Sequence, residues 1–233
     1  MPTTRKTTSI YRKTRKANAS HYKISGPYVI NLPHRKDRWS QFSKQAHELK
    51  LNPIRFNGVY HKDGATGCLK AHINALKQWS GEDAIWICED DCEFKVNAEV
   101  IHKTIGAFMK SPGDVLCLGY NSYNQKHYNK TFDRTFNCQT ATCYIIKSHM
   151  VQKILDIREH VLSHRLAGTT SPLKSIFRNL KIFKGKKVPE FERNDQCWKL
   201  LQQDFIFLIP KVRCAIQKKS FSDIEKKQVD YKV

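Results

Sequence analysis

The amino-acid sequence predicts an α/β domain with a mostly parallel central sheet flanked by helices. Short β-prone runs alternate with segments in which apolar residues recur every three or four positions, and strands separated by helices of about 10–15 residues typically form parallel sheets. The strand-like runs are apolar throughout, which is typical of strands covered on both faces. With 233 residues, 40% of them hydrophobic, the chain is expected to form one large domain over residues 26–233.

The first half of this domain contains two strand–helix units. The first expected strand is residues 28–32, and the helix after it begins at Asp37, a residue type that suits an N-cap. The second strand is residues 53–59. The helix that follows has Thr66 as its expected cap, and its apolar stripe is Leu69, Ile73, Leu76 and Trp79.

The second half continues the alternation. Residues 84–88 form the third expected strand, a helix follows around residues 97–109, and residues 114–120 form the fourth strand. Residues 141–147 are a further strand that leads directly into a helix starting with SHMVQKILDI. The order of elements therefore favours a single layered sheet with helices on its faces.

Two basic segments carry most of the net charge of +20. Residues 1–23 and residues 161–189 each contain seven Lys or Arg residues and no acidic residue. We expect residues 1–25 to be a disordered basic tail, with a targeting signal as the alternative. Residues 161–189 also contain Leu, Ile and Phe, which indicates a variable surface loop or a lid over an anionic ligand. Charge alone does not distinguish nucleic acid, acidic lipid and phosphate-bearing substrates.

Composition also bears on the compartment. The sequence has no run of 18 apolar residues and no apolar secretory segment near its start, so we expect a soluble, intracellular protein without a transmembrane segment. Eight cysteines raise the possibility of disulfides or zinc, but the sequence contains no Cys-x-x-Cys pair. Reduced thiols acting as small hydrophobes are the preferred interpretation for the cysteines in strand-like runs. These are Cys88, Cys117, Cys143 and Cys214.

Three adjacent carboxylates, Glu89, Asp90 and Asp91, directly follow the third strand. An acidic turn that ends the strand is the simplest interpretation. In parallel α/β sheets, however, ligands sit beyond the carboxyl ends of the strands. A hard divalent cation such as Mg²⁺ or Mn²⁺ would neutralise the carboxylates and hold a substrate phosphate. The position of the triplet therefore favours a metal site.

Residues near two other strands are further candidates. Asn31 ends the first strand, and Arg35 and Arg38 follow in a turn and a first helical turn. These arginines either pair with a phosphate or lie on a solvated helix start. His72 lies beside the apolar stripe of the second helix, where histidines are more often structural than catalytic. The sequence lacks the glycine motifs of Rossmann and P-loop proteins and the Gly-x-Ser-x-Gly elbow of α/β-hydrolases, which argues against those classes.

Five segments resemble glycosyltransferase family 25 in their order and spacing: YVINLPHRKDRW, GATGCLKAHINAL, IWICEDDCEF, LCLGY and ATCYIIKSHMVQKIL. That family includes lipooligosaccharide and procollagen galactosyltransferases, and the resemblance covers roughly residues 27–225. It implies a GT-A-like fold and an inverting hexosyltransferase. The implied donor is a UDP-sugar, with galactose or glucose first among the sugars, the acceptor is a glycan or hydroxylated protein, and the cofactor is Mn²⁺ or Mg²⁺.

The resemblance also implies site residues, position by position. Glu89 and Asp91 match the metal ligands of the family. Asp195, before a later helix, and Asp223, in a polar segment near the C-terminus, match acidic residues and are the candidates for the catalytic base, which removes the proton of the acceptor hydroxyl. For Asp195, an N-cap is the alternative role. The nucleotide-binding residues implied are Asn31, Leu32, Arg35, Arg38, His72 and Asp90.

The sequence departs from the family in two places. Cys88 stands where the family usually has a hydrophobic residue, and residues 161–189 do not align with it. We expect acceptor choice to depend on this unaligned segment.

The sequence is also compatible with two other classes of function. A nucleic-acid-binding protein would use the charge of +20 and the aromatic residues among basic ones near Phe177 and Phe183. That class gives the acidic triplet no role, and the sequence has no zinc-finger or RNP signature, so nucleic acid is not the expected partner. The second class is an inactive glycosyltransferase-like scaffold, against which the intact triplet argues.

Overall fold

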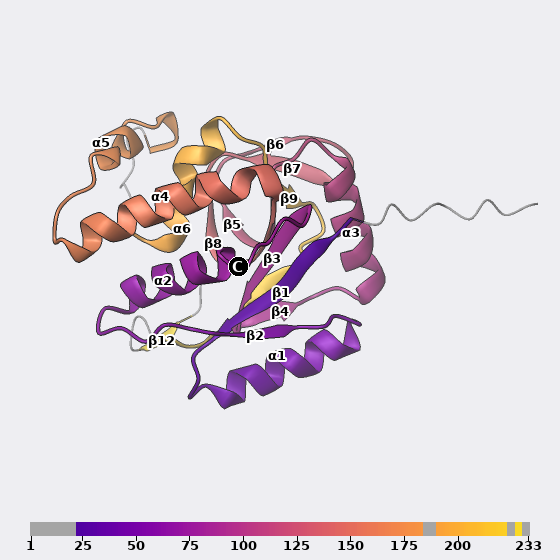
Figure 1. Cartoon of the computed structure of the whole chain (residues 1–233). Coiled ribbons are helices and arrows are strands. Elements are labelled where there is room, and N and C mark those ends of the chain that lie inside the picture. Colours follow the sequence, from indigo (N-terminus) through magenta and orange to yellow (C-terminus); the bar gives the residue numbers. More distant parts are fainter. Residues whose placement is uncertain (1–21, 184–189, 223–226, 230–233) are drawn as a thin grey trace, which may run out of the picture.

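The computed structural model describes residues 22–183, 190–222 and 227–229. The basic tail up to residue 21, the lysines of residues 184–187 and the candidate base Asp223 lie outside the described residues. The described chain forms a central sheet flanked by helices (Figure 1), which confirms the predicted α/β class.

The sheet has the strand order β2-β1-β3-β8-β5-β9-β7-β6, with β10 paired to β5 and β4 paired to β10. Its strands are β1 (Ile24–Asn31), β2 (Ile54–Asn57), β3 (Ala84–Glu89), β4 (Cys92–Phe94), β5 (Val115–Ser122), β6 (Gln125–His127), β7 (Phe132–Thr135), β8 (Cys138–Lys147), β9 (Phe207–Pro210) and β10 (Ala215–Gln217). A separate antiparallel pair consists of β11 (Ser220–Ser222) and β12 (Lys227–Val229).

The helices follow the strands in the predicted order. They are α1 (Lys36–Glu48), α2 (Gly64–Leu76), α3 (Ala98–Lys110), α4 (Ser148–Leu166), α5 (Leu173–Arg178) and α6 (Asn194–Cys197), with 3₁₀ turns η1 (Lys181–Phe183) and η2 (Trp198–Gln203). Among the described residues, no helix combines the length and the apolar character needed to cross a membrane.

The sheet is mixed. The expectation of a mostly parallel sheet holds for β2, β1 and β3, and for β5 with β9, but not for β8, which runs antiparallel to both β3 and β5. A parallel neighbour needs a crossover connection, usually a helix. The chain between β5 and β8 contains only β6 and β7, so it returns antiparallel. The helix α3 supplies the crossover that makes β3 and β5 parallel to each other.

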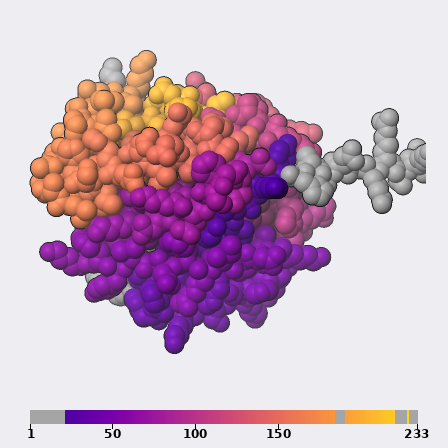
Figure 2. Space-filling model, viewed as in Figure 1, coloured from indigo at the N-terminus to yellow at the C-terminus, as the bar shows by residue number. Residues whose placement is uncertain are grey.

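Two apolar cores lie on opposite faces of the sheet. On one face, α2 and α4 contribute Leu69, Ile73 and Ile154 against Ile87 of β3 and Ile146 of β8. On the other face, the core is made by α1 and α3 with the alternate residues of the same strands, including Phe42, Ile101, Phe108, Trp86 and Ile145. In Figure 2, α4 and the segment after it occupy the upper left of this face, directly above α2. Because both faces are covered there, the central strands β3, β5 and β8 are apolar over most of their length.

Two predicted helix caps are wrong. The helix α1 begins one residue before Asp37, which forms an ion pair with Arg35. The helix α2 is capped by Asp63, whose carboxylate accepts hydrogen bonds from the backbone N–H of Ala65 and from the Thr66 hydroxyl. Both errors have one origin: an acidic or hydroxyl residue near a helix start can serve as cap or as cap partner, and the local sequence does not tell these roles apart.

The basic segment 161–189 is ordered in its described part. Its first residues belong to α4, and α5 and η1 follow. Phe177, Ile182 and Phe183 are buried in the same core as α2 and α4. The aromatic residues of this segment therefore pack against the domain, and the prediction that it acts as a lid stays untested.

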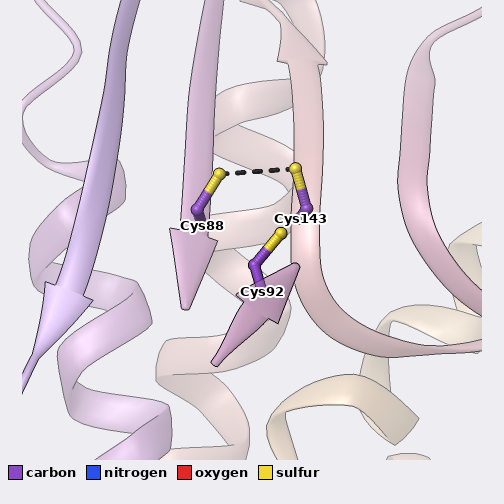
Figure 3. Close-up of side chains that lie close together, drawn as sticks. All are labelled: Cys88, Cys92 and Cys143. Atoms are coloured by element: carbon purple, nitrogen blue, oxygen red, sulfur yellow. Dashed lines mark hydrogen bonds between the residues drawn. The ribbon is translucent and has the colours of Figure 1, made fainter. Parts of the chain in front are cut away.

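All eight cysteines lie among the described residues and are free. Cys88 on β3, Cys92 on β4 and Cys143 on β8 point toward one another in the core (Figure 3), and the sulfur atoms of Cys88 and Cys143 are 3.3 Å apart. Their surroundings are apolar side chains, including Trp86 and Ala215. The three thiols fill core space beneath the acidic triplet.

Candidate active site

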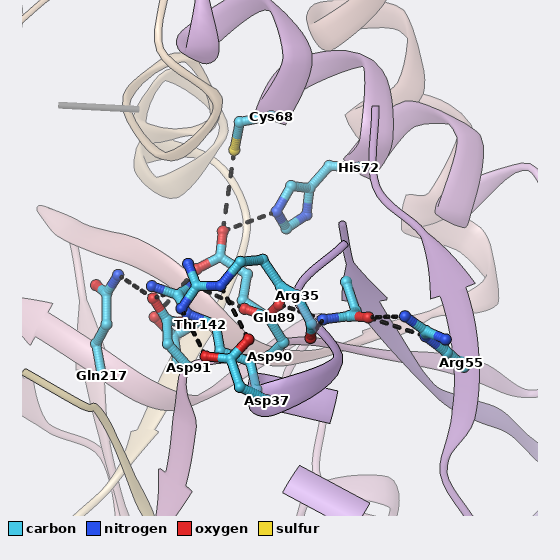
Figure 4. A network of polar contacts seen from close by, with 12 residues as sticks. Arg35, Asp37, Arg55, Cys68, His72, Glu89, Asp90, Asp91, Thr142 and Gln217 are labelled. Carbon is cyan, nitrogen blue, oxygen red and sulfur yellow. Dashed lines mark hydrogen bonds and ion pairs between the residues drawn. The ribbon is translucent and has the colours of Figure 1, made fainter. Parts of the chain in front are cut away.

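The acidic triplet lies where β1 and β3 end side by side. Ile30 pairs with Glu89 in the parallel ladder, and the backbone N–H of Asp90 donates to the carbonyl of Ile30 at 3.2 Å. This register places Glu89, Asp90 and Asp91 beside Asn31 and the start of α1. Figure 4 shows side chains from α2, β8 and β10 pointing toward the same three carboxylates. The predicted location at the carboxyl edge of the sheet is confirmed.

Asp90 is held on the α1 side of the triplet. Its carboxylate accepts hydrogen bonds from Asn31 Nδ2 at 2.6 Å and from Arg38 Nη1 at 2.8 Å. Asn31 is itself fixed, because its Oδ1 accepts from Arg55 Nε at 2.9 Å and Nη2 at 2.6 Å. The predicted nucleotide-binding residues Asn31, Arg38 and Asp90 thus form one connected network.

Asp91 lies near both Arg38 of α1 and Gln217 of β10. Its Oδ2 accepts from Gln217 Nε2 at 3.1 Å and lies 3.5 Å from Arg38 Nη1. Its Oδ1 is buried and has no hydrogen-bond partner among the described residues. Buried polar atoms in native proteins nearly always have a partner, so this oxygen is an available ligand position.

Glu89 points toward α2. Its Oε1 lies 3.0 Å from His72 Nε2 and 3.9 Å from the Cys68 sulfur, and its Oε2 accepts from the Thr142 hydroxyl at 3.3 Å. A glycine at residue 67 permits close packing of α2 against the segment after β2, since a Cβ there would lie 2.5 Å from the carbonyl oxygen of Val59. The helix α2 thus supplies Cys68 and His72 as neighbours of Glu89.

A buried hydrogen-bonded chain fixes His72. Arg158 Nη1 donates to the Tyr144 hydroxyl at 3.1 Å, and that hydroxyl lies 2.7 Å from His72 Nδ1. Burial, with Arg158 nearby, holds the pKa of His72 well below 6.5, so its ring is neutral. Because Arg158 can only donate, the hydroxyl of Tyr144 donates to Nδ1, and Nε2–H of His72 donates to Glu89. His72 thus orients Glu89, and its predicted role in nucleotide binding stays a prediction.

Burial and mutual repulsion make two of the carboxylates weak acids. Burial first, and then the charges of Asp195 and Asp90, raise the pKa of Glu89 to about 7. Burial first, and then the charge of Glu89, raise the pKa of Asp91 to about 7. In such a site a divalent cation would relieve both the desolvation and the repulsion.

These raised pKa values predict how the metal-free protein responds to pH. The folded state keeps protons on Glu89 and Asp91 up to a pKa of about 7, whereas the unfolded chain loses them near 4. The folded state therefore binds more protons in this window, and these two groups lower the free energy of unfolding as pH rises through 7.

The measurement is the melting temperature in EDTA between about pH 6 and pH 8. Between these two pH values, the melting temperature of wild type is expected to fall by at least about 3 °C more than that of a double variant, Glu89→Gln with Asp91→Asn. The two substituted side chains of this variant do not titrate. Most of the opposing effect of His72 falls below pH 6.5, and that histidine is present in both proteins. Parallel curves for the two proteins would show that the carboxylates are ionised throughout.

Two sets of side chains near the triplet have the composition of a metal site. Glu89 and Asp91 offer carboxylate oxygens, which suit Mg²⁺ or Mn²⁺, and the unpartnered Oδ1 of Asp91 fits a ligand position. Cys68, His72 and Glu89 also lie within 4.8 Å of one another. Burial and the charge of Glu89 raise the pKa of Cys68 well above 9, which disfavours the thiolate needed for ligation. The oxygen set is therefore the better candidate.

A polar cavity of about 180 Å³ opens beside the triplet. Glu89 and Gln217 line it on the triplet side, and Asp195 of α6 lines it on the other. Asp195 Oδ2 accepts from the backbone N–H of Thr140 at 3.2 Å and from Gln196 Nε2 at 3.0 Å. Asp195 is the second residue of α6 and not its N-cap. The alternative role of Asp195 as an N-cap is therefore wrong, and its side chain lines the cavity.

Three predicted site residues remain: Arg35, Leu32 and Asp223. Arg35 forms a two-point ion pair with Asp37, with distances of 3.1 and 3.0 Å, and its hydrogen bonds hold the pKa of Asp37 at about 2. Leu32 is half-buried, and its carbonyl accepts from the backbone N–H of Arg35 at 2.8 Å. Asp223 lies outside the described residues.

Several residues that line the site were not predicted from the sequence, because no local pattern marks them as site residues. Thr142 and Gln139 lie in β8, and Gln217 ends β10, far from the triplet in sequence. The contact of Gln217 with Asp91 depends on β10 joining the sheet. Asn194 and Gln196 flank Asp195, which is the signal that would have found them.

No family model matches the sequence, and no curated protein matches it. Solved structures similar to this chain include A197 from STIV, with a TM-score of 0.40 and 13% identity over 87% of this chain and 91% of that one. Another is a glycosyltransferase involved in glycosylation of the major capsid of PBCV-1, with a TM-score of 0.40 and 10% identity over 81% of this chain and 92% of that one.

A third is mannose-1-phosphate geranyltransferase from Thermus thermophilus, with a TM-score of 0.38 and 9% identity, covering 82% of this chain and 58% of that one. With TM-scores of 0.40 and below, these likenesses carry no weight for function, which we infer from the residues of the site. Membership of glycosyltransferase family 25 stays a prediction.

Proposed function

We propose that this protein is a metal-dependent inverting glycosyltransferase of the family 25 type, which transfers a hexose from a UDP-sugar to a glycan or hydroxylated protein. One observation carries the proposal. Glu89 and Asp91 lie at the end of β3, with an unpartnered Asp91 oxygen, and Glu89 lines a cavity that holds a further carboxylate, Asp195. One group of acids binds a cation, and a separate acid faces the place where an acceptor hydroxyl would react.

The triplet and its arginine supply the donor side of this site. Glu89 and Asp91 would hold Mn²⁺ or Mg²⁺, which as a Lewis acid neutralises the charge of the leaving nucleoside diphosphate. Arg38 lies against Asp90 and Asp91, at 2.8 and 3.5 Å, where its positive charge favours an anionic ligand near the triplet. Asn31 and Arg55 fix Asp90 and thereby the position of Arg38.

Asp195 supplies the acceptor side. Two donors hold its Oδ2, and among the described residues we find no donor to its Oδ1. That oxygen is available to accept the proton of an acceptor hydroxyl as the hydroxyl attacks the anomeric carbon, and the bond from that carbon to the diphosphate breaks. General-base catalysis of this kind typically contributes about 10²–10⁴-fold in rate.

The experiment is the release of UDP from UDP-galactose and from UDP-glucose, each tested with Mn²⁺, with Mg²⁺ and with EDTA. We expect release from at least one donor, by hydrolysis where no acceptor is added, and none in EDTA. Metal-dependent binding of UDP without any release, even with glycan and hydroxylated-peptide acceptors, would instead identify an inactive binding scaffold.

A further inference from the structure

The cavity beside Glu89 is lined by an unusual set of side chains. Five of the twelve lining residues carry a carboxamide: Asn121, Gln139, Asn194, Gln196 and Gln217. A carboxamide offers both donors and acceptors, which is the pairing capacity that a ring bearing several hydroxyl groups requires. The volume of about 180 Å³ is below the roughly 300–1,000 Å³ of pockets for drug-sized ligands, so the cavity suits a single ring.

Two of these amides have unmet hydrogen-bonding capacity. Asn194 is only 4% exposed, and among the described residues neither atom of its amide has a hydrogen-bond partner. Gln196 Oε1 is likewise buried without a partner in the described part of the chain. Leaving a buried donor or acceptor unpaired costs about 1–3 kcal/mol. Because the terminal torsion of an amide is broad, we expect these groups to turn toward a ligand in the cavity.

Gln139 is held with its donor end available. Its Oε1 accepts from Lys199 Nζ at 2.8 Å and from Gln196 Nε2 at 3.2 Å. Lys199 is only 1% exposed, and its ammonium lies over the Phe183 ring at 5.6 Å, so it is fixed in place. With its oxygen occupied twice, Gln139 has its Nε2 left to donate to a ligand.

The backbone at Thr140 is held in a conformation rare for its residue type. Its φ is 79°, in the left-handed region that β-branched residues seldom adopt. This conformation accompanies the hydrogen bond from its N–H to Asp195 Oδ2 at 3.2 Å. Such outliers cluster at ligand sites, where the surrounding structure maintains them. It is a second, independent mark of a built site at this wall of the cavity.

We propose that this cavity binds the ring of a neutral hexose carried by the donor, with the amides of Asn194, Gln196 and Gln139 hydrogen-bonding its hydroxyl groups. The inference rests on the proposed function, since the sugar reaches the cavity attached to the diphosphate bound at the triplet. Glu89 and Asp195 lie in the cavity wall, and the basic lining residue Arg193 forms an ion pair with Glu190 at 2.8 Å. A sugar carboxylate would therefore meet unfavourable charge.

The test is Asn194→Leu, which has a similar volume and no polar atoms. Because the side chain of Asn194 makes no hydrogen bond within the described residues, the melting temperature should stay equal or rise. The affinity for UDP with Mn²⁺ should be unchanged, whereas the affinity for UDP-galactose or UDP-glucose, whichever wild type binds, should fall about 10-fold, as for the loss of hydrogen bonds to a buried hydroxyl. UDP-glucuronate should bind wild type more weakly than the neutral donor.

The matched control is Asn137→Leu, because Asn137 is also a buried asparagine with an unpartnered Oδ1 in the described chain, but it does not line the cavity. It should change neither affinity. If Asn194→Leu does not fold, Asn194→Ala takes its place with the same expected loss. Unchanged UDP-hexose affinity, with normal UDP binding, would overturn the subsite and leave the proposed function standing. Absence of Mn²⁺-dependent UDP binding in wild type would refute the proposed function itself and the subsite with it.

Discussion

Asp91→Asn is expected to reduce UDP release from the donor at least 100-fold while leaving the fold intact. The large loss follows because a metal ligand contributes to a transition-state stabilisation worth several kcal/mol, or about 10²-fold or more in rate. The fold should be retained because Asn can still accept the hydrogen bond from Gln217. The substitution also removes a buried carboxylate whose pKa is raised to about 7 by burial and by Glu89.

The melting temperature of Asp91→Asn above pH 7 without metal should accordingly match or exceed that of wild type, a trade of stability against function that is common at active sites. Glu93→Gln is the matched control, because Glu93 lies two residues away and forms an ion pair with exposed Lys95. It should retain wild-type activity. An active Asp91→Asn enzyme would remove Asp91 from the metal site.

Asp195→Asn is expected to lose at least about 10²-fold in transfer to an acceptor, since the amide cannot accept a proton. Asn can still accept the hydrogen bond from the backbone N–H of Thr140, so the melting temperature should change little. UDP affinity at saturating Mn²⁺ should also be retained, because the hydrogen bonds of Asp195 go to Thr140 and Gln196 and not to the triplet. Separate measurements of transfer, UDP binding and melting temperature distinguish a base from a structural carboxylate.

The exposed carboxylate Asp204 provides the control for this experiment, and Asp204→Asn should transfer sugar like wild type. Wild-type transfer by Asp195→Asn would assign the base to another carboxylate. Asp223 would then be the next candidate, on its family resemblance alone. Loss of UDP affinity together with transfer would indicate that Asp195 shapes the donor site.

The sequence predicts the elements whose signals are local. The apolar runs that became β3, β5 and β8 are mostly buried on both faces, and the helical stripe of Leu69, Ile73 and Leu76 lies in the core as expected. The position of the triplet after β3 also follows from a local pattern, an apolar run that ends in three acids. Short strands such as β6 and β10 have only three residues each, too few to show a period.

The parts that escaped prediction depend on contacts between distant segments. The ligand environment of Asp91 includes Gln217, 126 residues away, and that of Glu89 includes Thr142, 53 residues away. The role of His72 depends on Tyr144 and Arg158, which belong to β8 and α4. Periodicity places each residue on its own element, but the antiparallel insertion of β8 between β3 and β5, together with the pairing of β10 with β4 and β5, brings these side chains together.

The melting temperature of the wild-type protein with UDP, in Mn²⁺ and in EDTA, tests most directly whether the triplet binds a diphosphate through a cation. At a UDP concentration about 100 times the dissociation constant, binding stabilises the folded state by about 2.7 kcal/mol. For a domain of this size, that corresponds to a rise of about 5–10 °C. We predict this rise in Mn²⁺ and no rise in EDTA. An equal rise in EDTA would contradict a metal role for Glu89 and Asp91, and no rise in either condition would contradict UDP binding.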